Sequence, residues 1–246
     1  MDSSLASHAL QYSGILIEAA LVLYMLWTSQ WRGQGGVPLY LSSLLCAQLT
    51  RAYILQVFGA RSRDYYYVYW STDLPLVISA FLLVCFLFQR ACRNEEKMWS
   101  LIRLLLLFVF VLVACISGLI FFHNYTYLNI NFIVEFNQDL YFTCLVLNTL
   151  LYLLLQYIES IDEQLGLLVC GVGIQFAGPT ATLALLRLTG GEPFAQSLTT
   201  AIMRLCSFGM LLVWAYAIVL GKGKETAVAR RKKPALAGEA TVNLNV

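Results

Sequence analysis

Charged residues are scarce in this chain, and their scarcity excludes a water-soluble protein. Of the 246 residues, 12% are Asp, Glu, Lys or Arg, whereas 59% are hydrophobic. Soluble domains contain about 25% charged and about 45–50% apolar residues. The composition therefore predicts an all-α, polytopic membrane protein, and we expect no nucleic-acid partner.

The residues that many catalytic and cofactor sites need are missing from the apolar runs. All five lysines lie outside these runs, which excludes a retinal Schiff base. The two histidines, His8 and His123, lie near the ends of runs and are too few for a three-histidine zinc site. The seven cysteines form no C-x-x-C pair, and no nucleophile-elbow, zincin or phosphate-loop motif is present. The sequence therefore predicts no cofactor or metal and indicates no enzymatic activity.

Seven apolar runs are each long enough to cross about 30 Å of hydrocarbon as a helix that rises 1.5 Å per residue. They cover residues 10–28, 38–58, 68–88, 101–122, 133–157, 165–188 and 195–221. The run at 101–122 has no charge in its middle, so we expect it to be the most exposed to lipid. The pattern predicts a seven-transmembrane-helix bundle over residues 1–221, followed by a basic tail, 222–246, that is expected to be disordered.

The distribution of positive charge predicts the orientation. Eleven of the 16 Lys and Arg residues lie on one side of the predicted spans and three on the other, while Arg51 and Arg204 lie within spans. Cytoplasmic loops carry the excess of positive charge. We therefore expect a protein of a cell membrane whose N-terminus faces the outside and whose C-terminus faces the cytoplasm. The tail is expected to contact anionic lipid through Arg230, Arg231, Lys232 and Lys233.

Apart from Arg103 and Arg187, which lie near span ends and are counted with the loops, six charged residues lie within the spans, although each costs about 2.5–3.5 kcal/mol on insertion scales. They are Glu18, Arg51, Asp73, Glu135, Asp139 and Arg204. Counting 1.5 Å per residue from the span ends places most of them about 8–13 Å below the outer surface. Helical spacing puts Gln48 on the face of Arg51, and it puts Gln175 on a face of small residues that permits close helix approach. These eight polar residues are the candidate ligand-binding set.

Two interpretations of this charged layer stay open. The acids and arginines can pair and lock the helices together, and matching depth on consecutive spans predicts an ion pair between Glu18 and Arg51. Four carboxyl groups nevertheless face two guanidinium groups, so an acid stays protonated, water enters, or a cation binds. On the second interpretation, Asp73, Asp139 and Arg204 line a cavity open to the outside.

The function most consistent with these observations is a sensor or accessory membrane subunit that binds a small ligand, or a membrane or cytoplasmic protein partner. The alternative is a small secondary transporter or channel whose in-span carboxylates hold cations or protons. The first three and last three spans show no similarity of the kind that internal repeats give many transporters. The inner half of the spans also lacks acids that could continue a proton path, which favours binding over transport. A purely structural subunit is the third possibility.

Overall fold

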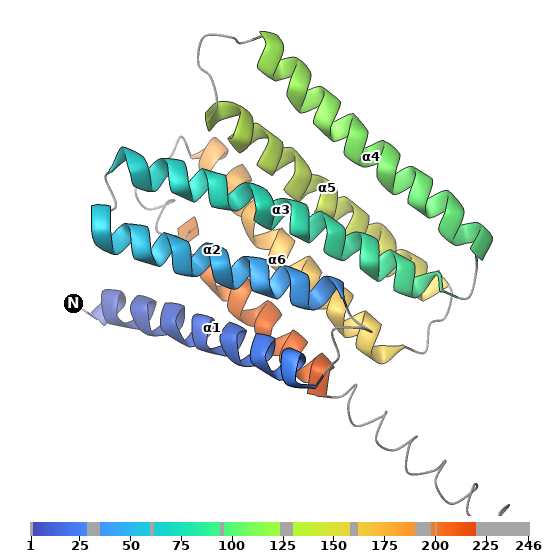
Figure 1. Cartoon of the computed structure of the whole chain (residues 1–246), viewed down its shortest axis with the longest axis horizontal. Coiled ribbons are helices and arrows are strands. Elements are labelled where there is room, and N and C mark those ends of the chain that lie inside the picture. The colour runs from blue at the N-terminus through green and yellow to red at the C-terminus, as the bar shows by residue number, and fades with distance from the viewer. Residues whose placement is uncertain are drawn as a thin grey trace, which may run out of the picture.

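The computed structural model of the chain describes residues 2–28, 35–59, 62–93, 96–123, 130–157, 162–189, 198–199 and 201–219. All the described elements are helices (Figure 1). They are α1 (Asp2–Trp27), α2 (Gly36–Phe58), α3 (Arg63–Ala91), α4 (Glu96–His123), α5 (Ile130–Tyr157), α6 (Glu163–Leu188) and an unlabelled C-terminal helix, Ala201–Val219. The basic tail, for which disorder and lipid contact were predicted, lies outside the described residues.

The helices fall where the apolar runs predict them, and the protein is a multi-pass membrane protein. Five helices contain segments long and apolar enough to cross a membrane: Tyr67–Ala91, Met98–Ile116, Phe136–Tyr157, Glu163–Thr182 and Ala201–Val219. The apolar part of α1, Tyr12–Trp27, is shorter. Helix α2 is not among the five, since polar residues such as Gln48 and Arg51 lower its mean hydropathy. Seven membrane crossings and the direction of insertion therefore stay predictions.

The end of α2 and the start of α3 are each marked by one residue of defined conformation. Gly59 ends α2 with a φ of 76°, a left-handed conformation that favours glycine. Ser62 then caps α3, because its Oγ accepts a hydrogen bond of 3.0 Å from the N–H of Tyr65. This start lies five residues before the predicted span at 68, and it brings the first turns of α3 beside the last turns of α2.

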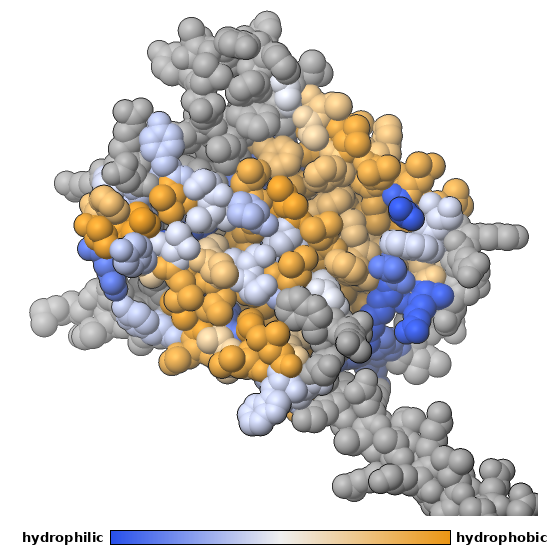
Figure 2. Space-filling view, viewed as in Figure 1, coloured by the Kyte–Doolittle hydropathy of each residue, from blue (hydrophilic) through white to orange (hydrophobic). Residues whose placement is uncertain are grey.

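Helix α4 lies at the edge of the molecule, whereas α3 lies among its neighbours (Figure 1). α4 packs mainly against α5, and α3 contacts α2, α4, α5 and α6. Of the five candidate spans, the one in α4 is the least buried, which confirms the prediction for 101–122. Hydrophobic residues cover much of the visible face of the molecule (Figure 2), as expected for a surface against lipid.

Helix α6 and the C-terminal helix approach closely at glycine positions. A Cβ atom built on Gly171 would lie 2.5 Å from the ring of Trp214, and one built on Gly178 would lie 3.0 Å from the Cβ of Cys206. The indole N–H of Trp214 donates a hydrogen bond of 3.1 Å to the carbonyl oxygen of Leu168. The face of small residues therefore does allow close helix packing, as predicted.

Candidate functional site: a polar pocket around Glu18

A pocket of about 340 Å³ lies between α1, α2, α3 and the C-terminal helix. Its lining residues are Gly14, Glu18, Gln48, Arg51, Ala52, Leu55, Tyr65, Tyr69, Met203, Arg204, Ser207, Phe208 and Leu211. Within each helix these residues are mostly three or four positions apart, which places them on one helical face. Leu55 near the end of α2 and Tyr65 near the start of α3 place the pocket toward the α2–α3 connection.

Glu18 has a deeply buried side chain that lines this pocket. The residue is 1% exposed, and its Oε1 accepts a hydrogen bond of 2.7 Å from the side-chain amide of Gln48. Its second oxygen, Oε2, has no hydrogen-bond partner in the described part of the chain. Leaving a buried acceptor unsatisfied costs about 1–3 kcal/mol. A donor from water or a ligand would therefore be stabilising at this position.

Arg51 holds α2 against α3 through several contacts. Its Nη2 lies 2.9 Å from Oδ1 of Asp73 and donates a second hydrogen bond of 3.2 Å to the carbonyl oxygen of Tyr69. Its Nε donates to Oγ1 of Thr72 at 3.0 Å, and the guanidinium lies 4.1 Å from the centre of the Tyr69 ring. Asn137 on α5 donates to Oδ2 of Asp73 at 3.1 Å. One ion pair thus connects three helices.

The predicted ion pair between Glu18 and Arg51 is wrong. Matching depth was a sound criterion, but it fixes only the height of a residue along a helix. α2 packs against both α1 and α3. Gln48 and Arg51 are three residues apart, so at 3.6 residues per turn they are turned about 60° from each other around α2 and can meet different neighbouring helices. Gln48 therefore meets Glu18 on α1, and Arg51 meets Asp73 on α3.

Asp73, Asp139 and Arg204 are not brought together as predicted. Arg204 lines the pocket, whereas Asp73 lies one contact away, against Arg51. Asp139 is exposed on α5 and is not among the residues that line this pocket. The residue of α5 that reaches the cluster is Asn137, two positions earlier and about 200° around the helix. The buried positions Leu140 and Cys144 follow it at helical spacing, and that apolar periodicity was the signal that could have identified the inward face.

Several uncharged polar side chains lie in the interior, and of these only Gln175 was in the predicted set. Tyr40 on α2 lies near Gln175 on α6, and both are buried. Tyr40 Oη, Gln175 Oε1, Asn137 Oδ1 and Asn148 Oδ1 have no hydrogen-bond partner among the described residues. Buried polar groups of this kind are commonly satisfied by ordered water. Gln175 thus belongs to the interior and is not among the residues lining the Glu18 pocket, and the side chain of Glu135 lies outside the described residues.

The donor set of the pocket suits a small organic molecule. Among the described residues, no three His, Cys, Asp or Glu side chains are grouped so that they could hold a metal ion. The pocket instead combines one carboxyl group, one amide and guanidinium groups with aromatic and aliphatic walls. A few convergent polar groups in an apolar setting are typical of small-molecule sites. Comparisons of the chain with protein-family models, curated protein sequences and solved structures find no match.

Proposed function

We propose that this protein binds a small amine in the pocket around Glu18 and acts as a sensor or accessory subunit in a cell membrane. Two observations support this: Glu18 lines a pocket of about 340 Å³, and its buried Oε2 has no hydrogen-bond partner among the described residues. An ammonium group would supply the missing donor as a charge-assisted hydrogen bond. The rings of Tyr65 and Phe208 in the pocket wall would add favourable contact with an apolar or aromatic part of the ligand.

The proposed direction of access is from outside the cell. The pocket lies toward the α2–α3 connection, which is the end of the molecule where the chain begins (Figure 1). The excess of Lys and Arg in the sequence predicts that this end faces outward. On that orientation, a ligand reaches Glu18 without crossing the membrane.

A proton or cation transporter is the second candidate, and a specific observation favours it. Each of Tyr40, Gln175, Asn137 and Asn148 has one buried oxygen atom without a hydrogen-bond partner among the described residues. Water bound to such atoms could extend a path from Glu18 deeper into the molecule. In that case Glu18 would exchange protons or bind a cation as part of transport.

Thermal unfolding in detergent, with and without tyramine as an aromatic amine probe, tests the proposal. We expect tyramine to raise the unfolding midpoint of the wild type and not that of Glu18→Gln. Glutamine keeps an oxygen that can accept the hydrogen bond from Gln48, so the variant should fold. Asp139→Asn is the matched control, since it also removes one carboxyl group but from an exposed site. An equal shift in all three proteins would contradict amine binding at Glu18.

A second measurement separates binding from transport. The purified protein is reconstituted into liposomes that contain a pH-sensitive dye, and a pH gradient is imposed. The proposal predicts no proton flux above that of protein-free liposomes. Flux in the wild type and in Asp139→Asn that disappears in Glu18→Gln would overturn the sensor proposal in favour of the transporter.

A further inference from the structure

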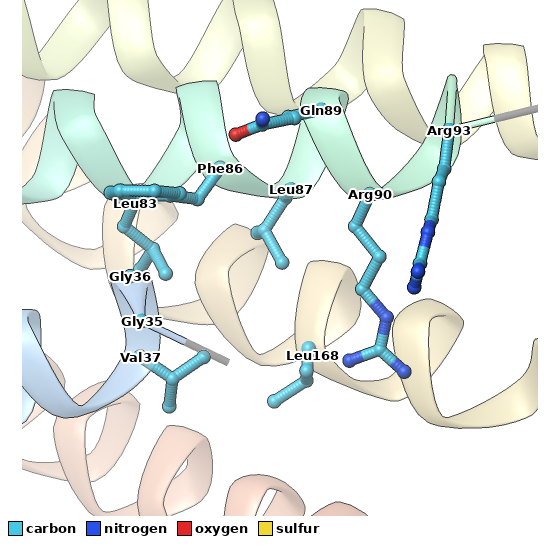
Figure 3. Close-up of a pocket in the computed structure, with 10 residues that line it drawn as sticks. All are labelled: Gly35, Gly36, Val37, Leu83, Phe86, Leu87, Gln89, Arg90, Arg93 and Leu168. Atoms are coloured by element: carbon cyan, nitrogen blue, oxygen red, sulfur yellow. The ribbon is translucent and has the colours of Figure 1, made fainter. Parts of the chain in front are cut away.

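A second pocket of about 340 Å³ lies at the opposite end of the molecule, where α3 ends and α2 begins (Figure 3). It is lined by Gly35, Gly36, Val37, Leu83, Phe86, Leu87, Gln89, Arg90, Arg93 and Leu168. Two of these residues are arginines and none is acidic. The lining of this pocket is therefore positively charged, whereas the Glu18 pocket combines two arginines with one carboxyl group.

The side chains of the two arginines, one in the last turn of α3 and one just beyond it, point to the same side (Figure 3). Arg90 is held in place, because its Nε and Nη2 lie 3.1 and 2.9 Å from Oδ2 of Asp162 and its Nη2 lies 2.8 Å from Oε1 of Gln164. Arg93 is exposed, two residues beyond the end of α3. A guanidinium group presents paired N–H donors that match the oxygens of a phosphate.

The start of α2 adds backbone donors on the other wall. The first N–H groups of a helix have no acceptor within the helix, and Gly35 at the N-cap provides no side-chain hydrogen bond to them. Gly36 and Val37 line the pocket. A Cβ atom on Gly36 would lie 2.8 Å from Phe86, so glycine lets α2 begin directly against α3. The positive end of the α2 dipole therefore faces the same space as the arginines.

The remaining wall is apolar and extends along the membrane-spanning part of α3. The candidate span Tyr67–Ala91 ends between Arg90 and Arg93, whereas Leu83 lies ten residues before Arg93, or about 15 Å along the helix. Leu83, Phe86 and Leu87 therefore lie at the depth of acyl chains, and the arginines lie at the depth of headgroups. A pocket with this layout fits a phospholipid better than a free anion.

We propose that this pocket binds a membrane lipid with an anionic phosphate headgroup, with the phosphate at Arg93, Arg90 and the start of α2. The alkyl chains lie against Phe86, which is the exposed apolar side chain of this wall, while Leu83 and Leu87 beside it are buried. The site is separate from the Glu18 pocket, and the proposal does not depend on what that pocket binds.

Lipid binding to the purified full chain in detergent, followed by native mass spectrometry, tests this proposal. Phosphatidylglycerol is the probe, with phosphatidylcholine as the zwitterionic comparison. We expect the wild type to retain phosphatidylglycerol in preference to phosphatidylcholine, and Arg93→Ala to weaken phosphatidylglycerol binding about tenfold. Arg93→Lys should retain part of the affinity, since a point charge still attracts phosphate. Arg93 is exposed, so its substitution leaves the folded core intact.

Arg103→Ala is the matched control, because it removes an exposed arginine that lies on α4 outside this pocket. It should bind phosphatidylglycerol like the wild type. Equal losses in Arg93→Ala and Arg103→Ala would mean general charge attraction and would overturn the site. Displacement of phosphatidylglycerol by inorganic phosphate at millimolar concentration would also overturn the lipid assignment, since it would show that the phosphate group alone binds.

Discussion

The described part of the molecule contains two Arg–Asp ion pairs with the same N–O distance of 2.9 Å, one toward each end. Arg51 and Asp73 join α2 to α3, and their side chains are 19% and 13% exposed. Arg90 and Asp162 join the end of α3 to the start of α6, and their side chains are 27% and 38% exposed. The same shortest N–O distance thus occurs in two different environments.

The environment, rather than the distance, decides what each pair contributes. The Arg51–Asp73 pair lies within the apolar helices, and it forms further hydrogen bonds with Thr72, Tyr69 and Asn137. Removing one partner there leaves a buried charge, which costs about 3–5 kcal/mol. The Arg90–Asp162 pair is partly accessible and so partly screened, and such pairs contribute about 0–1 kcal/mol.

The largest expected effect concerns which of the two ends faces outward, since a topology reporter gives an all-or-none answer. Reporter fusions after Arg32, Asn94 and Lys224 should be cytoplasmic, and fusions after Arg61 and His123 should be external. The reason is the excess of Lys and Arg on the first side. The activities of a cytoplasmic reporter and of an external reporter, each fused at every position, show which side of the membrane that position faces. An external Lys224 fusion would overturn both the seven-span count and the orientation.

The next largest effect is expected at the buried pair. Asp73→Asn or Arg51→Met alone should lower the free energy of unfolding by about 3–5 kcal/mol, because each leaves its partner uncompensated in an apolar environment. The double variant should recover much of that loss. Chemical unfolding of all four proteins in mixed detergent gives the coupling energy. Losses that simply add would show that the pair is not coupled in the folded protein.

Much of the fold could be predicted because hydropathy alone locates helices in a membrane protein. The apolar runs give the positions of all seven described helices, but they miss some boundaries. α3 begins at Arg63 because Ser62 caps it, whereas residues 63–67 are too polar to extend an apolar run. The apolar segment of α1 is short, and polar residues lower the mean hydropathy of α2. Composition alone therefore does not fix the number of helices that cross the membrane.

The candidate site was only partly predictable because depth and rotation are separate coordinates. Depth along the helices brought Glu18, Arg51 and Arg204 into the candidate set, and helical spacing from Arg51 added Gln48. The structure gathers these four around one pocket. Partner choice depends on rotation about each helix axis, which charge alone does not fix. Asp139 was therefore chosen on α5, although Asn137 is the residue that contacts Asp73. Tyr40 is neutral and sits in an apolar run, so a search for charge could not find it.

The smallest effects are expected at the more exposed pair, where Asp162 has two separable roles. Its Oδ2 accepts hydrogen bonds from Arg90, and its Oδ1 accepts one of 3.1 Å from the N–H of Leu165 at the start of α6. Asp162→Asn keeps a capping oxygen and removes the charge, so it should lower the free energy of unfolding by about 1 kcal/mol or less. Asp162→Ala also removes the cap and should cost about 1 kcal/mol more.

Salt separates this pair from the buried one. Raising NaCl from 0.05 to 0.5 M should shrink the difference between wild type and Asp162→Asn, because ions screen an accessible pair. The same change should shrink the difference between wild type and Asp73→Asn much less, because this pair is more deeply buried. Unfolding midpoints of the three proteins at both salt concentrations measure this. If Asp162→Asn destabilised the protein as much as Asp73→Asn did, and did so independently of salt, exposure would not be the property that distinguishes the two pairs. The network through Gln164, whose amide donates to the carbonyl oxygen of Ala217 at 3.2 Å, would then have to be counted as part of the enclosed core.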